Sequence, residues 1–121
     1  MAGAPAAQRF VEIRCYELKP GTAAEFDRLV TGESVPMLRR HGIDVVAFGP
    51  SLHDQDAYYL MRAYPSLQEL ERSEGAFYGS ESLRLGPREA ILACIDRYLS
   101  IVVELDHVTI DGLRRPSIAT R

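Results

Sequence analysis

The hydrophobic pattern of this chain switches from a period of two to a period of about 3.6 and back again, and it does so twice. A period of two is typical of a half-buried strand, whereas 3.6 is typical of an amphipathic helix. Strand-like patterns rich in β-forming residues cover residues 9–18, 43–48, 57–64 and 100–105. The sequence therefore predicts the order β-α-β-β-α-β.

The first helical stretch lies between the first two predicted strands. Thr22 and Glu25 have the spacing of a capping box, which marks a helix start. Pro36 lacks the N–H that an unbroken helix uses, so we expect a kink or a short break there. The apolar residues that share one face of this helix are Phe26, Leu29, Val30 and Met37.

The second crossover contains two shorter helical patterns. Ser66 and Glu69 repeat the capping-box spacing and predict a helix that ends near Gly75. Pro87 is well placed in the first turn of a further helix. The apolar positions that keep the helical period in this last helix are Ile91, Cys94, Ile95 and Tyr98.

This order of elements predicts one α+β domain of the ferredoxin-like βαββαβ class, with a four-stranded antiparallel sheet in the strand order 4-1-3-2. A length of 121 residues fits a single domain. We expect a flexible leader over residues 1–8, the domain over 9–105 and a C-terminal arm over 106–121. Helices are expected on one face only, which leaves an apolar sheet face for a partner.

Composition excludes several classes of function. The formal net charge is −3 and no run of Lys and Arg alternates with aromatics, so nucleic-acid binding is not expected. No apolar stretch approaches the roughly 18 residues of a membrane span, and the N-terminus lacks the basic region of a signal peptide. Cytoplasmic location is the resulting expectation. The three His residues are scattered, which predicts no metal site and no cofactor.

Two arginines on the central strands are the leading candidates for a site. Counting by twos places Glu12, Arg14 and Tyr16 on one face of the first strand. The third strand carries Arg62 with two tyrosines on one face. Buried charges need partners, so these groups are expected to cluster. The candidate substrate-binding residues are Glu12, Arg14, Tyr16, Tyr58, Arg62 and Tyr64.

Two interpretations of this cluster remain open. In the first, Glu12 pairs with both arginines and the cluster is purely structural. In the second, one guanidinium edge stays free and binds a carboxylate, phenolate or enolate. No other acid lies on that strand face, and Glu69, Glu71 and Glu74 are expected to form a solvated helix face.

Three segments resemble the NIPSNAP family. Residues 11–21 (VEIRCYELKPG) resemble its opening strand, residues 40–42 its helix exit, and residues 63–69 the junction of its third strand and second helix. The resemblance implies a dimeric α/β barrel, in which two four-stranded sheets close on each other. The wider barrel superfamily includes cofactor-free monooxygenases, isomerases, haem-degrading enzymes and decarboxylases, and the fold alone does not choose among them.

The function predicted from these observations is that of a homodimer that binds a small organic molecule. It could be a cofactor-independent enzyme of the monooxygenase or isomerase kind, in which Arg and Tyr stabilise an oxyanion. The alternative is a non-catalytic dimeric binding or scaffold module. Handling of haem would require an axial His facing a pocket, and neither His41 nor His53 is well placed for that role. The sequence names neither the ligand nor a reaction, and no catalytic residue is assigned.

Overall fold

The computed structural model of this chain describes residues 7–114, and its framework is one antiparallel sheet. The four strands lie in the order β2-β3-β1-β4, so the predicted order is confirmed. Residues 1–6 of the predicted leader and residues 115–121 of the predicted arm lie outside the described part. The strands are β1 (Phe10–Leu18), β2 (Asp44–Pro50), β3 (Ala57–Tyr64) and β4 (Ile95–Glu104).

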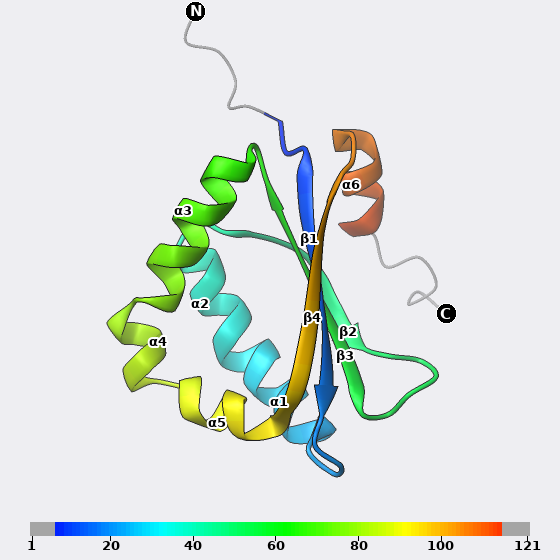
Figure 1. Ribbon diagram of the computed structural model, residues 1–121, viewed down its shortest axis with the longest axis vertical. Helices are drawn as coiled ribbons and strands as arrows, with labels where there is room; N and C mark the ends of the chain where they lie inside the picture. The colour runs from blue at the N-terminus through cyan, green and yellow to red at the C-terminus, as the bar shows by residue number, and fades with distance from the viewer. Residues whose placement is uncertain (1–6, 115–121) are drawn as a thin grey trace, which may run out of the picture.

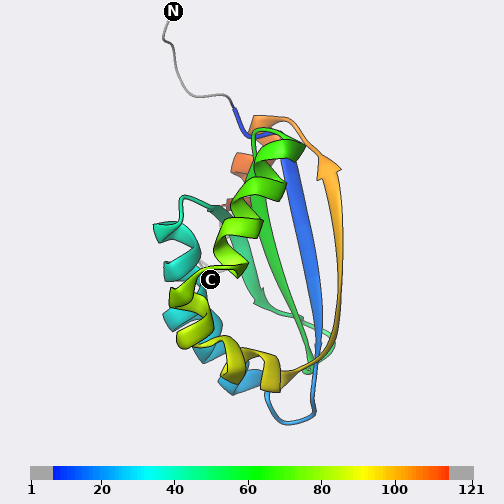
Figure 2. The same ribbon diagram turned by 60° about the vertical axis from the view of Figure 1, so that its left-hand side comes forward.

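Helices cover both faces of this sheet, unequally. Helices α1 to α5 lie on one face, whereas α6 lies alone against the other (Figures 1 and 2). The prediction of helices on one face only is therefore wrong at the C-terminal end. The helical segments are α1 (Ala23–Leu29), the π-helical η1 (Val30–Ser34), α2 (Val35–Arg40), α3 (Leu67–Tyr78), α4 (Glu81–Leu85), α5 (Arg88–Cys94) and α6 (His107–Arg114).

Helix α6 forms where an arm was expected, because it has both a cap and an apolar anchor. Asp106 accepts a hydrogen bond from the Thr109 N–H at 2.8 Å, which starts the helix. Ile110, only 1% exposed, packs in a small core with Val11 and Ala63. Part of the sheet face that we expected to meet a partner is thus covered by the chain itself.

The first helix continues through a π-helical segment, so the short break that was one expectation at Pro36 does not occur. Segment η1 continues α1 into α2 without leaving helical backbone, and it ends just before the turn that contains Pro36. Wider π-type bonding is one way to accommodate a residue that has no N–H to donate. The capping box predicted at Thr22 is wrong, because the Thr22 hydroxyl donates to the Lys19 carbonyl at 2.7 Å instead. The cap predicted at Ser66 is confirmed.

Strand β4 begins five residues earlier than predicted, and a β-bulge explains the error. Tyr98 pairs with Tyr16, and Ile95 pairs with Leu18, with a register shift between Glu17 and Leu18. The bulge adds one residue to β4, so Ile95 and Tyr98 both face the helices at a spacing of three. That spacing imitates the helical period, which is why the sequence pattern predicted a helix there.

Candidate functional site

Two arginines from neighbouring central strands meet at one acid on the helix-covered face of the sheet. Glu12 of β1 lies directly opposite Arg62 of β3 in the strand register. The Arg62 Nη2 donates to Glu12 Oε1, and the Arg14 Nη2 donates to Glu12 Oε2 at 3.1 Å. The Ser100 hydroxyl of β4 also donates to Glu12 Oε2, at 3.0 Å. Three strands therefore converge on this carboxylate.

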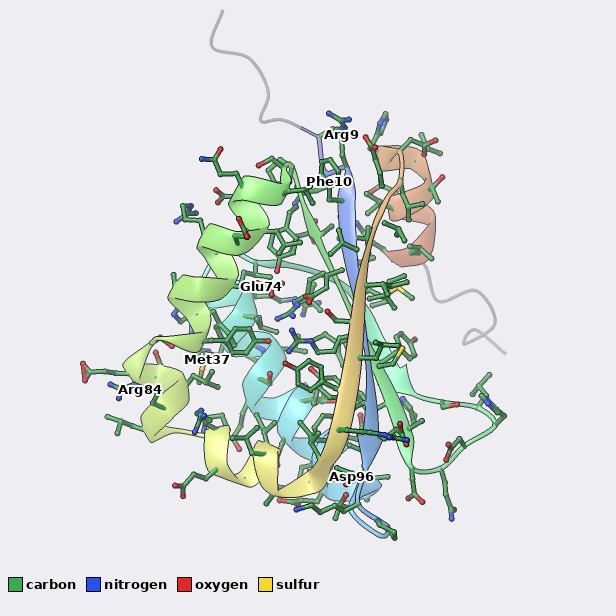
Figure 3. The ribbon with its side chains drawn as sticks, viewed as in Figure 1. Arg9, Phe10, Met37, Glu74, Arg84 and Asp96 are labelled. Atoms are coloured by element: carbon green, nitrogen blue, oxygen red, sulfur yellow. The ribbon has the colours of Figure 1, made fainter. Side chains whose placement is uncertain are left out.

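Helix α3 completes the cluster with two side chains that sequence reasoning did not assign to it. The Tyr78 hydroxyl accepts hydrogen bonds from Nη1 of both Arg14 and Arg62, each at 2.9 Å. Glu74, which extends from α3 toward the sheet (Figure 3), accepts a hydrogen bond from the Tyr64 hydroxyl at 2.6 Å. Glu74 Oε2 also lies 3.3 Å from Arg62 Nη2, and Glu74 Oε1 lies 4.0 Å from Arg14 Nη2.

The expectation that Glu74 belongs to a solvated helix face is wrong. Its side chain is only 13% exposed, because one turn of α3 turns Glu74 and Tyr78 together toward the sheet. The spacing of four between these residues could have revealed this, since Leu70 and Phe77 mark the same apolar stripe. The predicted end of the helix near Gly75 concealed it.

The surroundings of Glu12 and Glu74 shift the pKa values of these two carboxyl groups in opposite directions. Burial on its own raises the pKa of Glu12, but the hydrogen bond from Glu74 and the charges of Arg62 and Arg14 outweigh it and hold that pKa at about 2. Burial and the shared hydrogen bond with Glu12 raise the pKa of Glu74 to about 7. Near neutral pH, Glu12 is thus ionised while Glu74 can hold a proton.

Arg62 remains charged although its side chain is fully buried (0% exposed). Burial alone lowers the pKa of this guanidinium, but Tyr78, Glu12 and Glu74 raise it further than burial lowers it. A buried charge of this kind is tolerated only when its partners are fixed. Removing one of these partners should therefore lower the stability of the fold.

A cavity of about 260 Å³ lies between the sheet and the helices, next to the two arginines. Arg14, Arg62 and Tyr78 supply its polar end, and Tyr98 and Arg88 lie along its more exposed rim. The pKa of Tyr16, another lining residue, is raised to about 12, chiefly by burial. The apolar wall includes Leu38, Leu60, Phe77, Leu83, Ile91 and Ile95.

The guanidinium groups keep donors that nothing in the described chain accepts. The Nε atoms of Arg14 and Arg62 are buried and have no hydrogen-bond partner among residues 7–114. Glu12 does contact both arginines, as the structural interpretation requires, yet it does not use all of their donors. Buried donors without partners are rare, and they call for an acceptor such as a ligand or an ordered water.

The remaining candidate tyrosines support the site from outside the cavity. Tyr58 donates to Asp27 Oδ1 at 2.5 Å and so ties β3 to α1. Tyr64 holds Glu74, as described above. Of the six predicted site residues, Arg14, Tyr16 and Arg62 line the cavity, whereas Glu12, Tyr58 and Tyr64 do not.

Among residues 7–114, no three His, Cys, Asp or Glu side chains are arranged to hold a metal ion. His53 is exposed, and its Nδ1 contacts the Ser51 hydroxyl at 3.1 Å. His41 contacts its own helix, with Nδ1 lying 3.0 Å from the Met37 carbonyl. Within the same residues, no helix is both long and apolar enough to span a bilayer.

Comparison with known proteins relates the fold to one group of structures. No protein-family model and no curated protein sequence matches the chain. Among solved structures, an uncharacterized NIPSNAP-like domain protein from Burkholderia xenovorans superposes with a TM-score of 0.72 at 18% identity, covering 78% of this chain and 83% of the other. A NIPSNAP family protein of unknown function from Agrobacterium tumefaciens gives 0.74 at 17% identity, covering 85% and 93%.

A third structure carries a description of an activity. A candidate antibiotic biosynthesis monooxygenase from Nitrosomonas europaea superposes with a TM-score of 0.59 at 16% identity, covering 78% of this chain and 95% of the other. At these identities the likeness concerns the fold alone. The resemblance to NIPSNAP proteins expected from the sequence is confirmed at that level, as is the ferredoxin-like α+β class.

Proposed function

We propose that this chain, which has the fold of NIPSNAP proteins, works as a homodimer that binds a small organic molecule in the cavity between its sheet and its helices. The observation that carries the proposal is that Arg14 and Arg62, each with a buried Nε donor that has no partner among residues 7–114, line one end of a cavity whose wall is largely apolar. Ligand pockets typically combine apolar walls with a few placed polar groups, and this cavity has that composition.

The proposal of a pair of chains is supported by apolar side chains left on the sheet. Leu99 is 67% exposed and Ile101 is 51% exposed, and both lie on the face that carries α6. Ile13 and Met61 continue the patch toward the centre of the sheet. Val11 and Ala63, on the same face, are buried under α6, so the proposed contact is centred on the β4 side.

Catalysis is a second candidate function, favoured by the Nitrosomonas neighbour and by the donors that surround the cavity. Such an enzyme would act without a cofactor, with Arg14, Arg62 or Tyr78 stabilising negative charge on a substrate oxygen. A binding or scaffold module would use the same donors to hold an unchanged ligand. Chromatography of a ligand after incubation with the protein separates the two, since only the enzyme alters it.

We place the protein in the cytoplasm. Both cysteines are free thiols, Cys15 exposed and Cys94 buried, which suits a reducing compartment.

Two variants test the binding site with benzoate as the probe and neutral benzamide as its uncharged counterpart. Arg14→Met and Arg62→Met keep much of the bulk of each side chain and remove its charge. We expect wild-type protein to bind benzoate more tightly than benzamide, and Arg14→Met to stay folded by circular dichroism while losing most of that preference. If both variants fold and bind benzoate with wild-type affinity, the proposed site is wrong.

A further inference from the structure

The charges of the cluster formed by Arg14, Arg62, Glu12 and Glu74 do not balance when Glu74 is protonated. Arg14 and Arg62 contribute two positive charges, and Glu12 contributes one negative charge. Glu74 lies against the same Nη2 atoms of Arg14 and Arg62 that bind Glu12, and burial raises its pKa to about 7, so it can be protonated near neutral pH. In that state the cluster has an excess of one positive charge. Once Glu74 loses its proton, the excess disappears.

We infer that the cavity takes up a small organic monoanion together with one proton, which Glu74 holds. The inference rests on the proposed function and specifies its ligand and its regulation. An anion at the cavity end of Arg14 and Arg62 restores neutrality only while Glu74 is protonated. An ionised Glu74 already supplies that negative charge, so it competes with the ligand across the same two guanidinium groups.

The surroundings of Glu74 support this exchange. Four groups of the sheet face it: the Tyr64 hydroxyl and the Arg62 guanidinium from β3, with Glu12 and Arg14 from β1. The Arg14 Nη2 lies 4.0 Å from Glu74 Oε1. Burial and Glu12 favour the protonated form of Glu74, whereas Arg62 and the hydrogen bond from Tyr64 favour the ionised form, and the net effect is a raised pKa. From its own helix, Tyr78 bonds both arginines.

The shape and chemistry of the cavity define the class of anion. Guanidinium groups bind planar carboxylates through pairs of N–H donors, and the apolar wall of Leu38, Leu60 and Phe77 suits a ring or a short hydrocarbon. The cavity volume of about 260 Å³ admits only a small ligand. The ligand class is therefore a small aromatic or aliphatic carboxylate, or an enolate or phenolate of the same size.

Calorimetry of benzoate binding in two buffers that differ in ionisation enthalpy measures the number of protons taken up for each benzoate bound. Benzoate itself stays ionised above about pH 6, because a carboxyl pKa lies near 4. At a pH about one unit above the Glu74 pKa, we expect close to one proton to be taken up for each benzoate bound. The affinity should fall about tenfold for each further unit of pH.

Glu74→Gln imitates the protonated acid and is the key variant. It should bind benzoate without proton uptake and with an affinity that does not change across neutral pH. Glu71→Gln, on the exposed side of the same helix, is the matched control and should retain the wild-type proton uptake.

The outcomes separate the two proposals. Benzoate binding to wild-type protein with no proton uptake overturns this inference and leaves the proposed function standing. No binding of benzoate at any pH overturns both. Because proton uptake is measured on wild-type protein, the inference can be tested even if Glu74→Gln fails to fold.

Discussion

Glu12 and Arg62 lie directly opposite each other on the two central strands, and their ion pair is sealed beneath α3. Breaking a buried pair by removing one partner typically costs about 3–5 kcal/mol, because the other charge stays buried. We expect Glu12→Gln to lower the free energy of unfolding by about 3 kcal/mol, near the lower limit because Glu74 also contacts Arg62. Urea denaturation followed by circular dichroism measures the loss.

The matched control for this variant is Glu17→Gln, on the same strand. Glu17 pairs with Arg97 at 2.6 Å, but both side chains are more than half exposed. Exposed pairs contribute roughly 0–1 kcal/mol, so this change should have little effect. Equal losses for Glu12→Gln and Glu17→Gln would show that burial of the central pair does not matter to stability.

The free energy of unfolding should decrease with rising pH because the pKa of Glu74 is raised in the folded chain. The pKa of Glu74 is about 7 in the folded chain against an ordinary value of 4.5, so the folded state binds more protons between these two values. Its stabilising contribution is therefore complete below about pH 4.5 and is lost as pH rises toward about 7. Glu12, with a lowered pKa of about 2, acts in the opposite sense at more acid pH.

Glu74→Gln should remove this dependence. We expect the variant to exceed wild-type protein in free energy of unfolding by about 3 kcal/mol at about pH 8, and to lose that advantage near pH 4.5. Denaturant titrations at several pH values provide the measurement. A variant that is less stable than wild type at alkaline pH would contradict the assignment of the proton.

Tyr78 should be essential to the geometry of both arginines. Tyr78→Phe removes the oxygen that accepts from Arg14 and Arg62, so both Nη1 groups lose a partner. We expect a loss of about 1–3 kcal/mol in the free energy of unfolding and weaker benzoate binding. Tyr98→Phe is the control, since Tyr98 stacks over Arg14 at 4.5 Å through its ring, which the change retains. Equal effects of the two changes on benzoate binding would argue against the role of the Tyr78 hydroxyl.

Association of two chains should depend on the open part of the sheet. Ile101→Lys places a charge in the centre of the exposed apolar patch and should convert a dimer into a monomer, as judged by light scattering coupled to size-exclusion chromatography. Leu52→Lys makes the same change at the 95%-exposed Leu52 in the turn between β2 and β3, and it should leave the dimer intact. A monomeric wild-type protein at micromolar concentration would refute the proposed pairing.

Most of the fold could be predicted from the sequence because alternation and helical spacing are local signals. The strand of residues 57–64 was predicted with its observed limits, and β1 within one residue. The errors lie where local and tertiary signals conflict. At Ile95 a β-bulge gives a strand the spacing of a helix, and at Ile110 a helix is stabilised by a sheet surface that the sequence alone assigns to a partner.

The site was only half predictable, for a related physical reason. Glu12, Arg14 and Arg62 could be brought together because strand parity and antiparallel pairing determine which residues face each other. Glu74 and Tyr78 could not, since their contribution depends on how far α3 extends and on its rotation over the sheet. An acid on a helix looks solvated until the packing of that helix is known.

The central claim is that the cavity binds an organic anion at Arg14 and Arg62, and a benzoate titration of the nitrogen–proton correlation spectrum tests it most directly. The account predicts saturable shifts confined to amides of the elements that line the cavity, which are β1, β3, β4 and the helical segments from η1 to α5, and much smaller shifts with benzamide at the same concentration. Shifts that are absent, that fall outside these elements, or that are equal for benzoate and benzamide would contradict it.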